Sequence, residues 1–105
     1  IMFCAFEGPP EIVRLHGTGE VVEPSHSEYE QLAKLFPERG GVRAYIKLNA
    51  TRISDSCGYS VPIYEFKEDR DVLDKWVANK GEDGVKAYRL EKNTKSLDGL
   101  EGLLQ

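Results

Sequence analysis

The longest alternating pattern in the chain is "GVRAYIKLNATRIS", residues 41–54. Every second residue from Val42 to Ala50 is apolar, and the residues between them are mostly polar. A period of two is typical of a β-strand with one face on a core and the other in water. We therefore predict a long strand here, and its backbone donors and acceptors require neighbouring strands.

The N-terminal segment "IMFCAFEGPPEIVRLHGTGEVVEP" predicts two further strands. They are joined by a turn at 7–10, because Gly-Pro-Pro cannot continue a strand ladder. In the second strand the predicted core face comprises Val13, Leu15, Gly17, Gly19 and Val21. Its two glycines permit a bend or bulge, or the close approach of another group.

The chain opens directly on "IMFCAF", which reads as the middle of a half-buried strand with no polar lead-in. Consecutive strands tend to pair, so such a strand normally has a neighbour before it in the sequence. We therefore expect the chain to be the C-terminal portion of a longer protein.

Three short helices are predicted, within residues 25–41, 67–81 and 82–93. Ser27 with Glu30 fits a capping box for the first, and Gly81 is placed to end the second. Strands with helices between and after them predict an α+β protein, mainly an antiparallel β-barrel. We predict one partial domain over 1–105, with strands and one inserted helix in 1–66 and helices and a tail in 67–105. These strands alone would not close a barrel.

Composition excludes several classes of protein. A hydrophobic content of 40% and a charged content of 30% are those of a soluble globular protein. No apolar run is long enough to span a membrane, and a net charge of -4 without a basic stripe argues against nucleic-acid binding. Cys4 and Cys57 form no CxxC pair, and His16 and His26 have no zinc-site spacing, so we expect no metal. Free thiols in a cytoplasmic chain are the simpler interpretation, although a disulfide stays open.

The segment "RISDSCGYSVP", residues 52–62, gathers polar side chains where the long strand should end. Three serines offer hydroxyls, Gly58 allows close backbone approach or a positive φ, and Tyr59 supplies a flat ring with a polar tip. Composition alone favours a turn over a ligand loop.

Three other patterns bear on a possible site. His16 with Cys57 would make a base and a thiol nucleophile, but nothing in the sequence brings them together, and a structural cysteine is favoured. His16 shares a strand face with Arg14 and Thr18, which favours a polar outer face over a ligand site. "GTGEVVEP" lacks the third glycine of a dinucleotide motif.

Three blocks, "IMFCAFEGPPEIVRLHGTGEVVEP", "SDSCGYSVPIYEF" and "AYRLEKNTKSLDGLEGL", together resemble the C-terminal part of bacterial pyridoxamine 5'-phosphate oxidase-like proteins. The fold of that family is the FMN-binding split β-barrel. The resemblance implies a homodimer with FMN at the subunit interface, a cytoplasmic oxidoreductase, and hydride transfer carried by the flavin. It places most phosphate-binding residues ahead of Ile1.

The resemblance also implies that the segment after the long strand approaches the flavin from the partner subunit. On that basis Ser56, Cys57, Gly58 and Tyr59 are the predicted cofactor-binding residues, at the rim of the isoalloxazine or substrate pocket. Ser60 departs from the family's glycine. No catalytic side chain is assigned, and the absence of an "RLHdR"-like block after the last strand weakens pyridoxamine 5'-phosphate as a substrate.

Two alternatives stay open beside an FMN-dependent oxidoreductase or a fragment of one. The first is a flavin- or haem-binding split-barrel module without turnover, and the second is a structural half-barrel that binds nothing. Fold does not fix function, and the sequence names neither substrate nor electron donor.

Overall fold

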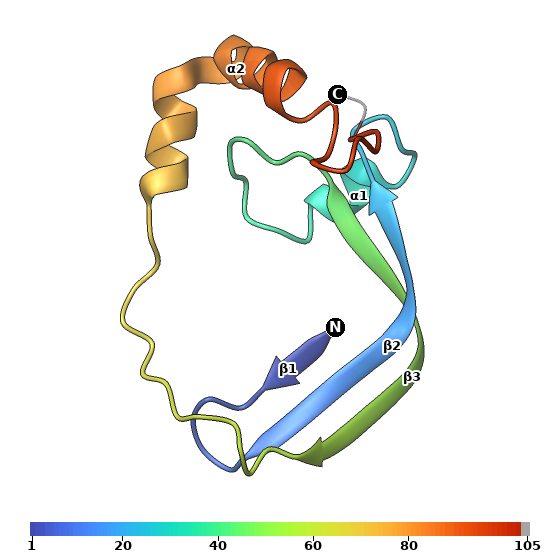
Figure 1. The fold of residues 1–105 in the computed structure, drawn as a ribbon, viewed down its shortest axis with the longest axis vertical. Coiled ribbons are helices and arrows are strands. Elements are labelled where there is room, and N and C mark those ends of the chain that lie inside the picture. The colour runs from blue at the N-terminus through green and yellow to red at the C-terminus, as the bar shows by residue number, and fades with distance from the viewer. Residues whose placement is uncertain (104–105) are drawn as a thin grey trace. The chain divides into compact units, whose positions relative to one another are not determined.

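The computed structural model describes residues 1–103. It divides into two compact units, which are described separately. Unit 1 comprises Ile1–Val22 and Tyr45–Asp69, and unit 2 comprises Glu23–Ala44 and the described residues from Arg70 onward. The element order along the chain is β1, β2, α1, β3, α2 (Figure 1).

Unit 1 is an antiparallel sheet with the strand order β1-β2-β3. Strand β1 is Met2–Cys4, β2 is Glu11–Val22 and β3 is Tyr45–Cys57. The two predicted N-terminal strands and their turn are therefore confirmed, and the long strand extends three residues beyond the alternating pattern. Figure 1 shows β2 and β3 curving together along their length. The described strands form an open sheet, so the α+β class is confirmed while the barrel stays a prediction.

A bulge interrupts the β2–β3 ladder. Pairing passes from His16–Arg52 to Gly17–Ala50, which leaves Thr51 as an extra residue on β3. An extra residue bends a strand and increases its local twist. The bulge thus lies at the first of the two glycines where the sequence predicted a bend or bulge.

The predicted apolar faces of β2 and β3 pair with each other across the ladder. Val21 lies opposite Ile46, and Leu15 lies opposite Ile53 beyond the bulge. Yet Ile46 and Ile53 are 70% and 69% exposed, and Val22, on the opposite face, is fully buried. On β2 itself Val13 and Leu15 are half-buried, and Val21 is 45% exposed. The prediction that the Val13–Val21 face forms the core is therefore wrong for the described residues.

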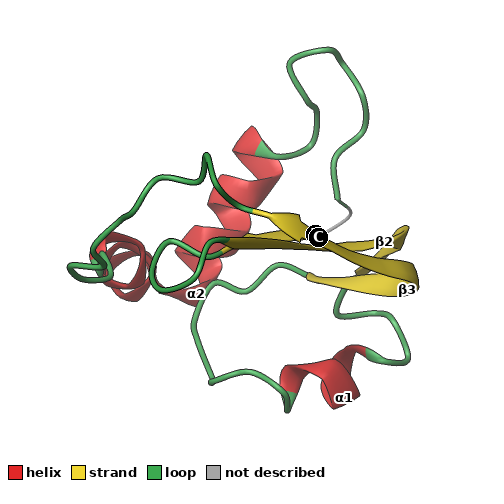
Figure 2. Cartoon of the chain, turned by 90° about the horizontal axis from the view of Figure 1, so that it is seen from below, coloured by secondary structure: helices red, strands yellow, loops and turns green. Residues whose placement is uncertain are grey.

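Unit 2 contains two helices, α1 at Tyr29–Ala33 and α2 at Val72–Lys92. The predicted count of three helices is wrong, because the second and third form one element broken at Gly81 (Figure 2). Gly81 has φ 69° and ψ 171°, a conformation essentially restricted to glycine. Gly81 therefore interrupts the helix where the sequence predicted its end, and a second helical segment follows within α2.

The predicted capping box of α1 is also wrong. The helix begins at Tyr29 with Glu28 at the N-cap, and no side chain caps it from that position. Instead the Glu28 amide donates to His26 Nδ1 at 3.1 Å, and the Tyr29 amide donates to the His26 carbonyl at 3.0 Å. His26 therefore satisfies two amides at the start of α1, in place of the predicted pairing of Ser27 with Glu30.

Candidate functional site

The four predicted site residues span the end of β3 and the turn after it. Ser56 and Cys57 are the last residues of β3, and Gly58 and Tyr59 follow directly. The Gly58 amide donates to the Pro10 carbonyl at 3.3 Å, which ties this segment to the turn before β2. The structure therefore places the four residues at one end of the sheet.

Gly58 is explained by packing against backbone. It is buried, and an added Cβ would lie 2.8 Å from the Glu11 nitrogen and 3.1 Å from the Pro10 carbonyl carbon. Its φ is not positive. The sequence predicted either a positive φ or a close approach of another group at Gly58. The structure supports the close approach, and the approaching group is the backbone of Pro10 and Glu11.

The other three residues do not share one face of the sheet. Successive strand residues point to opposite faces, so Ser56 and Cys57 point apart. Cys57 is exposed and Cys4 is partly exposed, and both are free thiols, so no disulfide joins them in this structure. Tyr59 is 84% exposed, which leaves its ring open to a flat partner.

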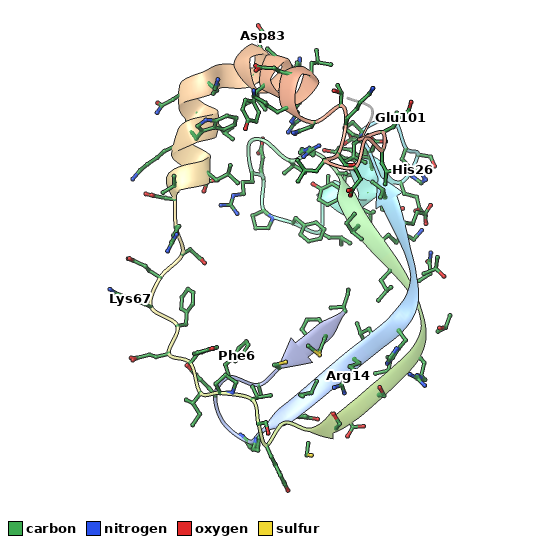
Figure 3. The ribbon with its side chains drawn as sticks, viewed as in Figure 1. Phe6, Arg14, His26, Lys67, Asp83 and Glu101 are labelled. Atoms are coloured by element: carbon green, nitrogen blue, oxygen red, sulfur yellow. The ribbon has the colours of Figure 1, made fainter. Side chains whose placement is uncertain are left out.

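Ser56 belongs to a polar cluster that the sequence interpretation missed. The cluster, called the donor row below, comprises Arg14, His16, Arg52, Ser54 and Ser56 on one face of β2 and β3. Arg14 Nη1 donates to Ser56 Oγ at 2.8 Å, and His16 Nε2 lies 3.3 Å from Ser54 Oγ. Arg52 Nη2 lies 3.2 Å from His16 Nε2. Figure 3 labels Arg14, which marks the position of the cluster on β2.

The donor row favours an anionic or oxygen-rich ligand. Within residues 1–103, neither Arg14 nor Arg52 forms a salt bridge with a carboxylate. Guanidinium groups present several N–H donors in a fixed fork that suits phosphate and carboxylate oxygens. Ser54 and Ser56 add hydroxyls that both donate and accept. In the sequence, the alternating polar residues of "RLH" and "RISDS" were the only indication of this cluster. The register of β2 and β3 is what brings the two motifs together.

Other site types find no support among the described residues. His16 and Cys57 lie on opposite faces of the sheet, so they do not form the base and nucleophile pair that the sequence had also disfavoured. In the described part of the chain, no group of three or more His, Cys, Asp or Glu residues gathers as a metal site. Across residues 1–103, neither helix has the length and apolar content needed to cross a membrane.

One curated relative is similar to this chain over nearly its whole length. It is the pyridoxamine 5'-phosphate oxidase family protein ustO of Aspergillus flavus, 31% identical over a 120-residue alignment. The alignment covers 98% of this chain and 47% of the relative, so the chain spans about half the relative's length. No family model and no solved structure matches the chain.

Proposed function

We propose, from the now confirmed resemblance to the pyridoxamine 5'-phosphate oxidase-like family, that the chain is part of an FMN-dependent oxidoreductase. The observation that carries the proposal is the match over 98% of this chain to a member of that family. The whole protein would be a cytoplasmic homodimer that transfers hydride through flavin at its subunit interface.

The residues of unit 1 fit FMN chemically. The cofactor carries a phosphate and a flat ring system with carbonyl oxygens, which require N–H and O–H donors and an aromatic or apolar surface. Arg14, Arg52 and Ser56 supply donors, and Tyr59 supplies an exposed ring. When bound, FMN would supply the hydride-transfer chemistry, and the protein would supply binding, orientation and exclusion of water.

The two arginines of the donor row and Gly58 would have separate tasks. Arg14 holds the Ser56 hydroxyl at 2.8 Å, which would fix that group toward a flavin oxygen. Arg52 lies against His16, and its other guanidinium nitrogens are left to meet an anionic oxygen. Gly58 would act indirectly, because its packing on Pro10 and Glu11 sets where Tyr59 begins.

The two faces of the sheet support the family architecture. The exposed apolar face, which includes Ile46 and Ile53, would lie inside a barrel completed by segments outside this chain. The donor row, on the opposite face, would then lie on the outside of the barrel and toward the second subunit. This arrangement would place the flavin where two subunits meet.

Visible absorption of the purified full-length protein tests the proposal. A flavin spectrum, or uptake of added FMN, is expected. Arg14→Met should weaken FMN binding at least about tenfold, the worth of one charged hydrogen bond. Arg70→Met is the matched control, because Arg70 is exposed and lies outside the donor row. A protein that takes up no FMN would overturn the proposal.

A second measurement separates an enzyme from a binding module. Reduction of the bound flavin by NADPH or NADH, followed by reoxidation in air, is expected of an oxidoreductase. A flavin that binds but is reduced by neither donor would favour the non-catalytic alternative. Haem absorption in place of flavin absorption would also contradict the proposal.

A further inference from the structure

We propose that unit 2 holds a binding pocket for a small zwitterion with an apolar side chain, in the class of the aliphatic amino acids. The pocket, called the Arg43 pocket below, has a volume of about 480 Å³. Its walls include Glu23, Pro24, Arg43, Lys86, Arg89 and Leu90. All of these residues belong to unit 2, so the pocket lies within one compact body.

Two orphaned polar atoms point to a ligand. Arg43 Nε and Glu23 Oε1 are buried, and within residues 1–103 neither has a hydrogen-bond partner. Leaving a buried donor or acceptor unsatisfied is unfavourable, so such atoms are rare in folded proteins. One orphan is a donor and the other an acceptor, and both residues line the same pocket. A ligand that satisfies both must carry an acceptor and a donor.

The charges of the pocket indicate the ionic character of that ligand. Arg43, Lys86 and Arg89 are cationic, and Glu23 is the only carboxylate on the wall. In the described part of the chain, Arg43 and Lys86 form no salt bridge. The excess of positive charge favours an anionic group, and Glu23 favours a cationic one and would repel a phosphate dianion. An α-carboxylate beside an α-ammonium group meets both requirements.

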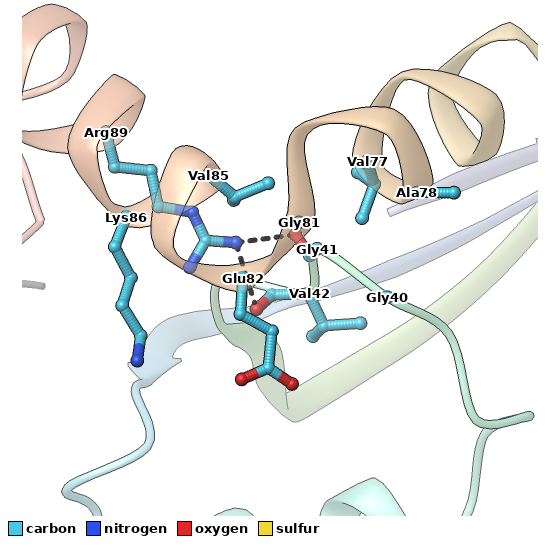
Figure 4. Close-up of a pocket in the computed structure, with 10 residues that line it drawn as sticks. All are labelled: Gly40, Gly41, Val42, Val77, Ala78, Gly81, Glu82, Val85, Lys86 and Arg89. Carbon is cyan, nitrogen blue, oxygen red and sulfur yellow. Dashed lines mark hydrogen bonds between the residues drawn. The ribbon is translucent and has the colours of Figure 1, made fainter.

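Arg89 is held in place by the chain. Its Nη2 donates to the Gly41 carbonyl at 2.7 Å and to the Val42 carbonyl at 3.2 Å (Figure 4). These bonds join the segment before β3 to α2, and they fix the guanidinium without pairing its charge. Lys86 lies one turn earlier on α2, so both cations come from one rigid element.

The size and lining of the pocket indicate the character of the ligand's side chain. Small-molecule sites have volumes of roughly 300–1,000 Å³ and are mostly apolar with a few placed polar groups. At about 480 Å³ the Arg43 pocket is within that range. Leu90 and Pro24 provide apolar wall beside the charged groups. An aliphatic side chain is therefore expected next to the zwitterionic head.

Isothermal titration calorimetry on the full-length protein with three matched probes tests the proposal. The probes are L-leucine, 4-methylpentanoate, which lacks the ammonium group, and 3-methylbutylamine, which lacks the carboxylate. L-leucine should bind, and each of the other two should bind at least about tenfold more weakly, because each leaves one buried polar atom without a partner. Absence of L-leucine binding, or equal binding of all three probes, would overturn the proposal and favour a bridging water between Arg43 and Glu23.

Variants locate the site if L-leucine binds. Arg43→Met and Glu23→Gln should each reduce the affinity for L-leucine at least about tenfold. Glu30→Gln, on the exposed surface of α1, makes the same chemical change as Glu23→Gln and should leave the affinity unchanged. Unchanged affinity in both pocket variants would reject this pocket. FMN absorption of the same samples is read separately, since the Arg43 pocket and the donor row belong to different units.

Discussion

Replacement of Gly17 by alanine should disrupt the β2–β3 ladder at its bulge, whereas replacement of Gly19 should not. An added Cβ at Gly17 would overlap the Asn49 carbonyl oxygen and lie 2.9 Å from the Ala50 Cα. Both are backbone atoms of the partner strand, so they cannot move aside as a flexible side chain would. At Gly19, two residues along the same strand and on the same face, an added Cβ meets nothing within 4 Å.

The magnitude follows from these two environments. Forcing extra volume into a packed site costs about 1–3 kcal/mol, so Gly17→Ala should lower the free energy of unfolding by that amount or more. Gly19→Ala should raise it by up to about 1 kcal/mol, because glycine in a strand loses more backbone entropy on folding than alanine. The two variants should therefore differ by about 1–4 kcal/mol.

Urea unfolding monitored by far-ultraviolet circular dichroism measures the difference. With a slope of about 2 kcal/mol per molar, the unfolding midpoints of the two variants should differ by about 0.5–2 M. Amide hydrogen exchange then locates the effect, since faster exchange should be confined to β2 and β3. Equal midpoints for Gly17→Ala and Gly19→Ala would refute the assignment of Gly17 as a steric requirement of the bulge.

Two further predictions concern unit 2. Gly81→Ala should destabilise the protein by about 1–3 kcal/mol, because Gly81 has φ 69°. Gly84→Ala, at an ordinary helical position, should instead stabilise it by up to about 1 kcal/mol. Thermal unfolding measures both changes, and a stabilising effect of Gly81→Ala would contradict the kink at Gly81. The hydrogen bonds from Arg39 hold the pKa of Asp74 below its ordinary value of 3.8. The pair therefore stabilises the folded state above pH 3.8, and this stabilisation is lost as the pH falls through the lower pKa of the folded state. A carboxyl NMR titration should show the Asp74 midpoint returning toward 3.8 in Arg39→Gln, and an unchanged midpoint would exclude Arg39 as the cause.

The sheet could be predicted from the sequence because its signals are local. Alternation identifies a strand and its two faces, and Gly-Pro-Pro identifies a turn. The helical region was less predictable at its boundaries. Gly81 does break the helix. The sequence alone does not distinguish a glycine that kinks a helix from a glycine that ends one. The capping box at Ser27 failed because α1 begins later, at Tyr29, with Glu28 at the N-cap.

The candidate site was only partly predictable because it depends on pairing between distant segments. The sequence located Ser56 at a strand end, but its partner Arg14 is 42 residues away and is placed opposite by the strand register. The bulge at Thr51 also changes which residues of β3 lie on the same face of the sheet as Arg14 and His16. The Arg43 pocket is less predictable still, since its walls come from two segments separated by the whole of β3.

The two faces of the sheet require different neighbours. Side chains alternate along each strand, so the residues of the donor row cannot turn toward whatever covers Ile46 and Ile53. An apolar surface is stabilised by contact with other apolar side chains, whereas unpaired guanidinium groups are stabilised by water or an anion. One partner surface cannot serve both. Burial of the apolar face inside a completed barrel would therefore leave the donor row available to a ligand, and the proposed flavin site needs this separation.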